Sequence, residues 1–179
     1  MPPPASETQL LAAARTGDRG AFTRLVSEST PTLERLALRL VGHRQDAEDV
    51  AQDAVLSAWR DLGGFRGGAR FQTWVCRILV RKALDLLRRR KSPAPPTAAP
   101  AVVEAPDAIA SQRETERLLR AAIDELPPVQ RATLLLRADQ GLSYDEIAYV
   151  LGSNRNAVRV NLLLARKRLG ERLRGVIDR

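Results

Sequence analysis

The chain has 179 residues and a formal charge of +8, and 44% of it is hydrophobic with few aromatic residues. A single cysteine and a single histidine exclude an intrachain disulfide or Cys/His zinc cluster, and we expect no metal or cofactor. The start, MPPPASETQ, and the lack of about 20 consecutive apolar residues predict neither export nor membrane insertion, and therefore a cytoplasmic protein. Charge alone does not choose between nucleic acid, a membrane surface and nonspecific binding.

The first part of the chain predicts a bundle of helices, as its Ala, Leu and Arg content favours. Ser6 and Gln9 have the spacing of a capping box for a helix that ends near Thr16. Gly17 then breaks the pattern, and Asp18 can cap the next helix. Further helices are predicted over about 18–29, 31–41, 46–62 and 69–91, with the loop GGFRGG at 63–68.

A linker is predicted at residues 92–112, between domains at 1–91 and 113–179. Its first part, SPAPPTAAPAVVEAP, holds five prolines, almost no charge and no periodic apolar face. Fully extended to Arg113, it would span roughly 68 Å, equivalent to about 20 base pairs. It either lets two lobes reach separate DNA segments or is a tolerated spacer.

The second part predicts four helices. Ser111 and Glu114 have capping-box spacing for a helix that ends near the LPP sequence at 126–128, and the next helix covers about 128–139. The apolar side of the first of these helices is expected to be Ile109, Leu118, Leu119, Ala122, Ile123 and Leu126.

The last two helices form a predicted helix-turn-helix. Ser143 and Glu146 make a capping box before YDEIAYVL, Gly152 supplies the turn, and Ser153 is expected to cap a helix that begins near Asn154. That helix suits a major groove. Its core stripe is Val158, Leu162, Ala165 and Leu169, while its flanks and outer side carry Arg155, Arg159, Arg166 and Lys167.

Helix 46–62 is predicted to have an alanine-rich core side and an acidic exposed side. An acidic face repels phosphate, so it faces either water or a basic protein partner. The core side is Ala47, Ala51, Ala54, Ala58 and Leu62, and the exposed side holds Asp46, Asp49 and Asp53.

Helix 69–91 is predicted to carry a basic stripe about 27 Å long. Arginines beside an aromatic ring suit a DNA strand whose bases are unstacked, and Trp74 borders the stripe. The alternative is that Trp74, like Trp59, is a core residue. The stripe consists of Arg70, Arg77, Arg81 and Arg88.

The sequences LPP-x-Q-R, GLSYDEIA, LG and ARKRL within 126–170 resemble region 4 of bacterial sigma factors of the extracytoplasmic-function (ECF) class. The run DAEDVAQDAVLSAWRDLGGFRGGARFQTWVCRILVRKALDLLRRR at 46–90 resembles region 2 of the same class. Two matches in the expected order, over roughly 18–91 and 113–173, are more specific than a lone helix-turn-helix. The resemblance implies an all-α fold of two small domains and a protein that directs promoter-specific transcription initiation without catalysis.

The resemblance also implies partners and site residues. The partners are bacterial core RNA polymerase, promoter DNA and, as a further candidate, an anti-sigma factor. The implied polymerase-binding residues, which dock on clamp helices of the largest subunit, are Asp46, Asp49, Gln52 and Asp53. The residues implied to bind and open the −10 element, with the loop at 63–72, are Arg70, Trp74, Arg77, Arg81 and Arg88. The residues implied to bind the −35 element are Arg155, Asn156, Arg159 and Lys167.

The chain departs from the family pattern in both DNA-reading segments. Where relatives commonly read I-A-R-N, residues 78–81 are ILVR, so a guanidinium replaces an amide that can contact a base. In the last helix, Val160, Asn161, Leu163 and Leu164 replace serine, arginine, histidine and arginine, which makes the outward face apolar. These side chains either contact thymine methyls, with Asn156 pairing to adenine, or cover a protein such as an anti-sigma factor or second copy.

Two other functions compete with a sigma factor. A stand-alone helix-turn-helix regulator normally needs a dimerisation element, and no convincing dimer helix is present. A DNA-modifying enzyme is disfavoured because the sequence has no metal-ligand cluster, Gly-rich phosphate loop or Ser/His/Asp set. Cys76 lies beside Val75 and Ile78 and is expected to be a packing residue, with redox sensing as the alternative.

Overall fold

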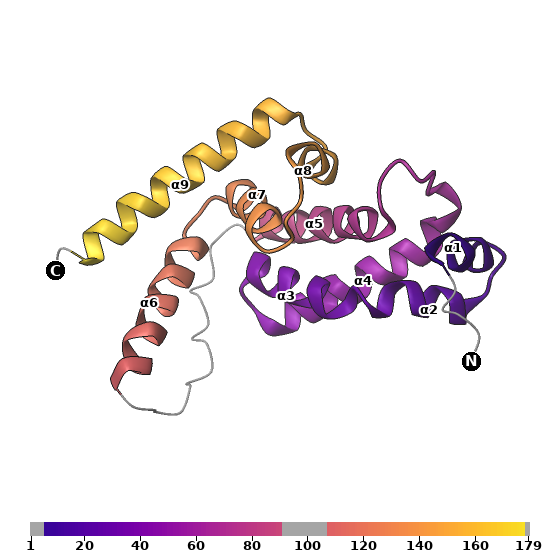
Figure 1. Cartoon of the computed structure of the whole chain (residues 1–179), viewed down its shortest axis with the longest axis horizontal. Coiled ribbons are helices and arrows are strands. Elements are labelled where there is room, and N and C mark those ends of the chain that lie inside the picture. The colour runs from indigo at the N-terminus through magenta and orange to yellow at the C-terminus, as the bar shows by residue number, and fades with distance from the viewer. Residues whose placement is uncertain (1–5, 91–106, 178–179) are drawn as a thin grey trace. The chain divides into compact units, whose positions relative to one another are not determined.

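The structure is a computed structural model that describes residues 6–90 and 107–177 (Figure 1). This described part contains helices and no strands, which confirms the predicted all-α fold. The chain divides into two compact units, and the boundary falls after Asp85, within α5.

Unit 1 contains the helices expected from the first part of the sequence. Ser6 accepts a hydrogen bond from the backbone N–H of Gln9, whose side chain accepts one from Ser6 N–H, so the predicted capping box is confirmed. Asp18 caps the next helix through Ala21 N–H at 3.0 Å. The helices are α1 (Glu7–Arg15), α2 (Arg19–Ser27), α3 (Thr30–Val41), α4 (Arg44–Asp61), the short 3₁₀ helix η1 (Leu62–Gly64) and α5 (Phe71–Arg89).

The core of unit 1 forms where α3 packs against α4 and α1 against α2. The predicted core side of α4 is confirmed, since its four alanines and Leu62 are all buried. Small alanine side chains let the backbone of a neighbouring helix come close. The inner side of α5 adds Phe71, Val75, Cys76, Leu79, Val80 and Ala83.

An aromatic cluster occupies the end of unit 1 where the loop between α4 and α5 runs. Phe71 contacts Phe22, Phe65 and Trp74 with ring centroids 5.8 to 6.2 Å apart, and Trp59 meets Phe22 edge-on at 5.0 Å. Two side chains of α1 form hydrogen bonds that hold this loop in place. The guanidinium of Arg15 donates to the carbonyl of Phe65, and Glu7 accepts from the N–H of Phe71 at 3.5 Å.

Unit 2 contains the four predicted helices, and the longest of them, α9, packs against the other three (Figure 1). The predicted cap at Ser111 is wrong, because α6 already begins at Asp107 and includes Ser111. An aspartate in the first turn favours a helix start, and the following alanines and isoleucine continue it. The predicted linker loses 107–112 to this helix, and 91–106 lie outside the described residues. The helices are α6 (Asp107–Asp124), α7 (Pro128–Ala138), α8 (Tyr144–Leu151) and α9 (Arg155–Ile177).

The LPP-x-Q-R sequence forms the junction between α6 and α7. Arg131 donates to the carbonyls of Asp124 and, at 3.3 Å, Leu126, and so satisfies acceptors at the end of α6. Burial lowers the pKa of the Arg131 guanidinium, and the Asp124 carboxylate partly opposes this shift. Gln130 is buried and accepts from the guanidinium of Arg168 on α9 at 2.6 Å. This motif therefore joins three of the four helices.

Candidate functional site

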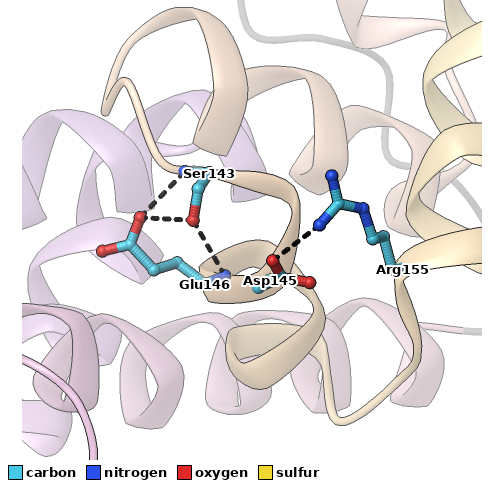
Figure 2. Close-up of polar contacts among 4 residues, drawn as sticks. All are labelled: Ser143, Asp145, Glu146 and Arg155. Atoms are coloured by element: carbon cyan, nitrogen blue, oxygen red, sulfur yellow. Dashed lines mark hydrogen bonds and ion pairs between the residues drawn. The ribbon is translucent and has the colours of Figure 1, made fainter.

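The helix-turn-helix consists of α8, a tight turn and α9. Ser143 and Glu146 form the predicted capping box, in which Ser143 N–H donates to the Glu146 carboxylate at 2.8 Å and Glu146 N–H donates to Ser143 Oγ at 3.3 Å (Figure 2). Gly152 takes a left-handed conformation with φ of 61°, which a residue with a side chain adopts only at a cost. The predicted start and turn are both confirmed.

The cap of α9 is Asn154, and the prediction of Ser153 is wrong by one residue. The backbone N–H of Ser153 donates to the carbonyl of Ala148 at 2.9 Å and so closes the C-terminal turn of α8. Asn154 follows, and its Oδ1 accepts from the N–H of Ala157 at 2.9 Å. The turn after Gly152 uses one more residue than the sequence pattern suggested.

Arg155 is held within the helix-turn-helix. Its guanidinium pairs with the Asp145 carboxylate at 2.8 Å (Figure 2). The same guanidinium lies 6.0 Å from the centre of the Tyr144 ring. Arg137 approaches the same ring at 5.6 Å and donates to the carbonyl of Leu142 at 2.9 Å. These contacts fix the start of α9 against α8, so Arg155 has a positioning role in addition to any contact with DNA.

The two predicted sides of α9 are confirmed. Val158, Leu162 and Ala165 are buried, and Leu169 is half-buried. Because successive residues of a helix are rotated by about 100°, the opposite side carries the polar and apolar residues that stay exposed. The exposed residues away from the core stripe include Arg155, Asn156, Arg159, Val160, Leu163, Leu164, Arg166 and Lys167.

The acidic face of α4, defined as Asp46, Asp49, Gln52 and Asp53, lies opposite its alanine side. Asp46 is half-buried and the other three residues are exposed. The Asp53 carboxylate lies 3.6 Å from Nζ of Lys82 on α5, whereas no described side chain pairs with Asp49. Sequence reasoning missed Leu56, which is 52% exposed one turn after Gln52. Leu56 follows Asp53 by three residues and Gln52 by four, and this helical spacing could have placed it on the acidic face.

The arginine stripe of α5 consists of Arg70, Arg77, Arg81 and Arg88, and all four side chains are exposed. Arg70 precedes the helix, and its carbonyl accepts from Trp74 N–H at 3.0 Å. Trp74 is half-buried and packs on Phe65 at 5.1 Å, so it belongs to the aromatic cluster and keeps a partly exposed surface.

No group of three or more His, Cys, Asp or Glu side chains in residues 6–90 and 107–177 is placed to hold a metal. In the same residues, no helix is long and apolar enough to cross a membrane. Cys76 is buried inside unit 1, and this burial raises the pKa of its thiol to about 12. The thiol is therefore protonated at neutral pH, which agrees with packing rather than redox chemistry.

Comparisons with known proteins decide the family. Residues 25–92 match the family model of Sigma-70 region 2, and residues 116–169 match that of Sigma-70 region 4. The ECF RNA polymerase sigma factor SigM of Mycobacterium tuberculosis is 39% identical over 173 residues, which cover 97% of this chain and 87% of SigM. The chain belongs to the ECF class of RNA polymerase sigma factors. Sigma factors are regulatory, non-catalytic proteins.

Other relatives of this sigma factor agree. The RNA polymerase sigma-H factor of Pseudomonas aeruginosa is 32% identical over 184 residues, covering 96% of this chain and 95% of the relative. The solved structure of CnrH in complex with the cytosolic domain of CnrY matches with a TM-score of 0.70 and 29% identity, over 93% of this chain and 96% of the matched chain. The sigma factor RpoE in complex with the anti-sigma factor NepR, from Bartonella quintana, matches with a TM-score of 0.69 and 25% identity. The match covers 86% of this chain and 96% of the matched chain.

Proposed function

We propose that this sigma factor binds core RNA polymerase through the acidic face of α4, opens the −10 element along the arginine stripe of α5, and contacts the −35 element with α9. Domain 1–91 holds the first two surfaces, and the domain that begins with α6 at Asp107 holds the third. The protein works in the cytoplasm, uses no cofactor and catalyses no reaction itself. The exposed acidic face, inside the segment that matches region 2, is the observation that supports polymerase binding most directly.

The acidic face fits a protein better than it fits DNA. Phosphates would be repelled by its carboxylates, whereas a basic protein surface would be attracted. Leu56 adds an exposed apolar side chain to the same side of α4, and apolar contact strengthens a protein interface. Asp49 should contribute more than Asp53 to the affinity for core RNA polymerase, because the Asp53 carboxylate already has Lys82 as a partner.

The stripe of α5 fits single-stranded DNA. Its exposed arginines can pair with successive phosphates, and Trp74 presents part of its ring beside them. The aromatic cluster and the contacts of Glu7 and Arg15 hold the preceding loop in place, so the stripe and loop act as one surface.

Helix α9 fits the major groove, since it is the second helix of a helix-turn-helix and its first half is basic. Arg159 and Lys167 are exposed and suit phosphates, Asn156 suits a base edge, and Arg155 sets the angle of the helix through Asp145.

We also propose an anti-sigma factor as a partner. CnrH was solved with the cytosolic domain of CnrY and RpoE with the anti-sigma factor NepR, and both matches extend over most of this chain. Val129 on α7, which is 45% exposed, offers apolar surface for such a protein.

Polymerase binding is tested by charge reversal on α4. Two variants are compared: Asp49→Lys alone, and a double variant that also carries Asp53→Lys. Neither should be captured by core RNA polymerase or support promoter-dependent run-off transcription. Their circular dichroism spectra should be unchanged. Asp61→Lys is the matched control, because Asp61 is an exposed acid at the end of the same helix but off the acidic face. Full capture of the double variant would contradict the assignment.

A further inference from the structure

Three exposed aliphatic side chains on α9 have no structural explanation within unit 2. Val160, Leu163 and Leu164, called the apolar triplet here, are 54%, 68% and 38% exposed. The buried side of the same helix is already complete without them, since Val158 and Leu162 are at most 2% exposed. Contact of this aliphatic surface with water is unfavourable, and adjacent exposed apolar side chains of this kind mark a binding surface.

The position of the triplet in the helix-turn-helix indicates what kind of ligand covers it. In this motif the N-terminal part of the second helix reaches the edges of the bases. The triplet begins five residues after the first residue of α9 and extends over about 6 Å of helix axis, which corresponds to about two base pairs. Asn156 lies on the same side, one turn earlier, and is exposed.

The surroundings of the triplet favour DNA over a protein. Residues 155–168 contain five basic residues and no acidic one. Arg159 and Arg166 are exposed along one flank of the triplet, and Lys167 is exposed one turn beyond it. This charge suits phosphates on either side of a groove. A stable protein interface would use roughly 20 to 30 residues on each side, far more than three.

We propose that the apolar triplet reads the C5-methyl groups of thymines at adjacent base pairs of the −35 element, with Asn156 reading a neighbouring adenine. In the major groove only thymine presents a methyl group, while guanine and cytosine present polar atoms there. Aliphatic side chains cannot hydrogen-bond to those polar atoms. A G·C pair opposite the triplet would therefore lose its hydrogen bonds to water and gain none from the protein, which lowers affinity. This inference rests on the proposed binding of α9 to the −35 element and adds its base preference.

The test uses the full-length protein with core RNA polymerase purified from the bacterium that encodes it. Selection from promoters randomised around −35 should enrich adjacent A·T pairs. Each selected thymine is then replaced by deoxyuridine, which removes only the methyl group. Binding of the holoenzyme should weaken about fourfold for each contacted thymine that is replaced, because burial of one methyl group raises affinity by about this factor.

The variant Leu163→Ala connects this preference to the triplet. It should bind the selected promoter several-fold more weakly and should no longer respond to deoxyuridine at the thymine that Leu163 contacts. Leu119→Ala is the matched control, because Leu119 is 41% exposed on α6 of the same unit. Its binding and its response to deoxyuridine should equal those of the unchanged protein.

The other outcomes separate this inference from the proposed function. If initiation depends on the −35 sequence but G·C pairs are selected, or deoxyuridine has no effect, the inference is wrong and the proposed function stands. If Leu163→Ala leaves −35 binding unchanged and abolishes a complex with another protein, the triplet is a protein interface and the inference is also wrong. If the unchanged protein supports initiation at no promoter, the proposed function itself fails.

Discussion

The two helices assigned to DNA present opposite kinds of surface. Helix α5 exposes a row of arginines above a deeply buried inner side, with Trp74 at its edge. Helix α9 exposes Val160, Leu163 and Leu164 at the centre of its outer side, with Arg159 and Arg166 at one flank and Lys167 one turn further along. One surface offers charge, which any DNA strand satisfies, and the other offers apolar contact, which only some bases satisfy.

This difference separates binding strength from selectivity. Phosphate contacts are independent of sequence and weaken as salt rises, because counterions compete for the phosphates. Methyl contacts depend on sequence and hardly on salt. Under the two proposals, α5 holds the opened strand largely by charge, while α9 selects the promoter largely by shape and apolar contact. The comparison gives four predictions, in order of decreasing effect.

The largest effect is expected from reversing charge on α5. Arg70→Glu combined with Arg81→Glu removes two charge-assisted contacts, which should lower open-complex formation on the order of 100-fold. Permanganate reactivity of unpaired thymines near −10 measures the effect. Arg24→Glu on α2 is the control, since Arg24 is exposed in the same unit but lies off the stripe. If the double variant and the control open the −10 DNA equally well, α5 does not bind the opened strand by charge.

The second prediction concerns how α9 begins. Asn154→Ala removes the side chain that caps α9 and should lower the free energy of unfolding of unit 2 by about 1 kcal/mol. Ser153→Ala should change it by less than about 0.5 kcal/mol, because only the backbone of Ser153 is used. Urea denaturation followed by circular dichroism compares the two variants. A larger loss for Ser153→Ala would contradict the observed cap.

The third prediction uses salt to distinguish the two surfaces. Arg81→Ala should reduce the slope of log affinity against log salt by about 0.7, the value for one phosphate contact on single-stranded DNA. Leu163→Ala should lower affinity and leave the slope unchanged, since no counterion is released at a methyl contact. Holoenzyme binding to a promoter opened at −10 is titrated from low to moderate salt. A reduced slope for Leu163→Ala would place that side chain near a phosphate-binding cation instead.

The smallest effect is expected at the buried side of α5. Because the pKa of Cys76 is raised to about 12, folded protein at pH 8 should contain almost no thiolate and should not react with iodoacetamide. Unfolding restores an ordinary pKa, so reaction in denaturant should be complete. Raising the pH from 8 to 9 should destabilise the fold by only about 0.4 kcal/mol, since the unfolded state then begins to release a proton that the folded state retains. Fast alkylation at pH 8 would show that the inner side of α5 opens to solvent.

Local features of the sequence predicted much of the fold. The capping boxes at Ser6 and Ser143, the left-handed turn at Gly152 and the alanine side of α4 depend on residues within one or two helical turns of each other. Such short-range patterns carry over directly from sequence to structure. The exposure of Arg77, Arg81 and Arg88 follows for the same reason, because their spacing of 4 and 7 places them on one face of α5, whereas Arg70 precedes the helix.

Features that depend on neighbouring helices were harder to predict. Leu119 was expected on the buried side of α6 but is 41% exposed. Helix α9 meets α6 near Glu125, which pairs with Arg172 at 2.7 Å, and a helix face is buried only where another helix covers it. Likewise, no periodic pattern showed that Lys82 would approach Asp53 or that Arg15 would hold the loop at Phe65. These residues are far apart in sequence.

The sequence by itself therefore determined the family, the helices, and the chemical character of each exposed face, since these depend on residue identity and helical spacing. Tertiary structure alone decided that Asp53 of α4 lies beside Lys82 and that Leu119 of α6 stays exposed. The reason is physical: pairing and burial between helices are set by distances between segments, and those distances exist only after the helices have packed.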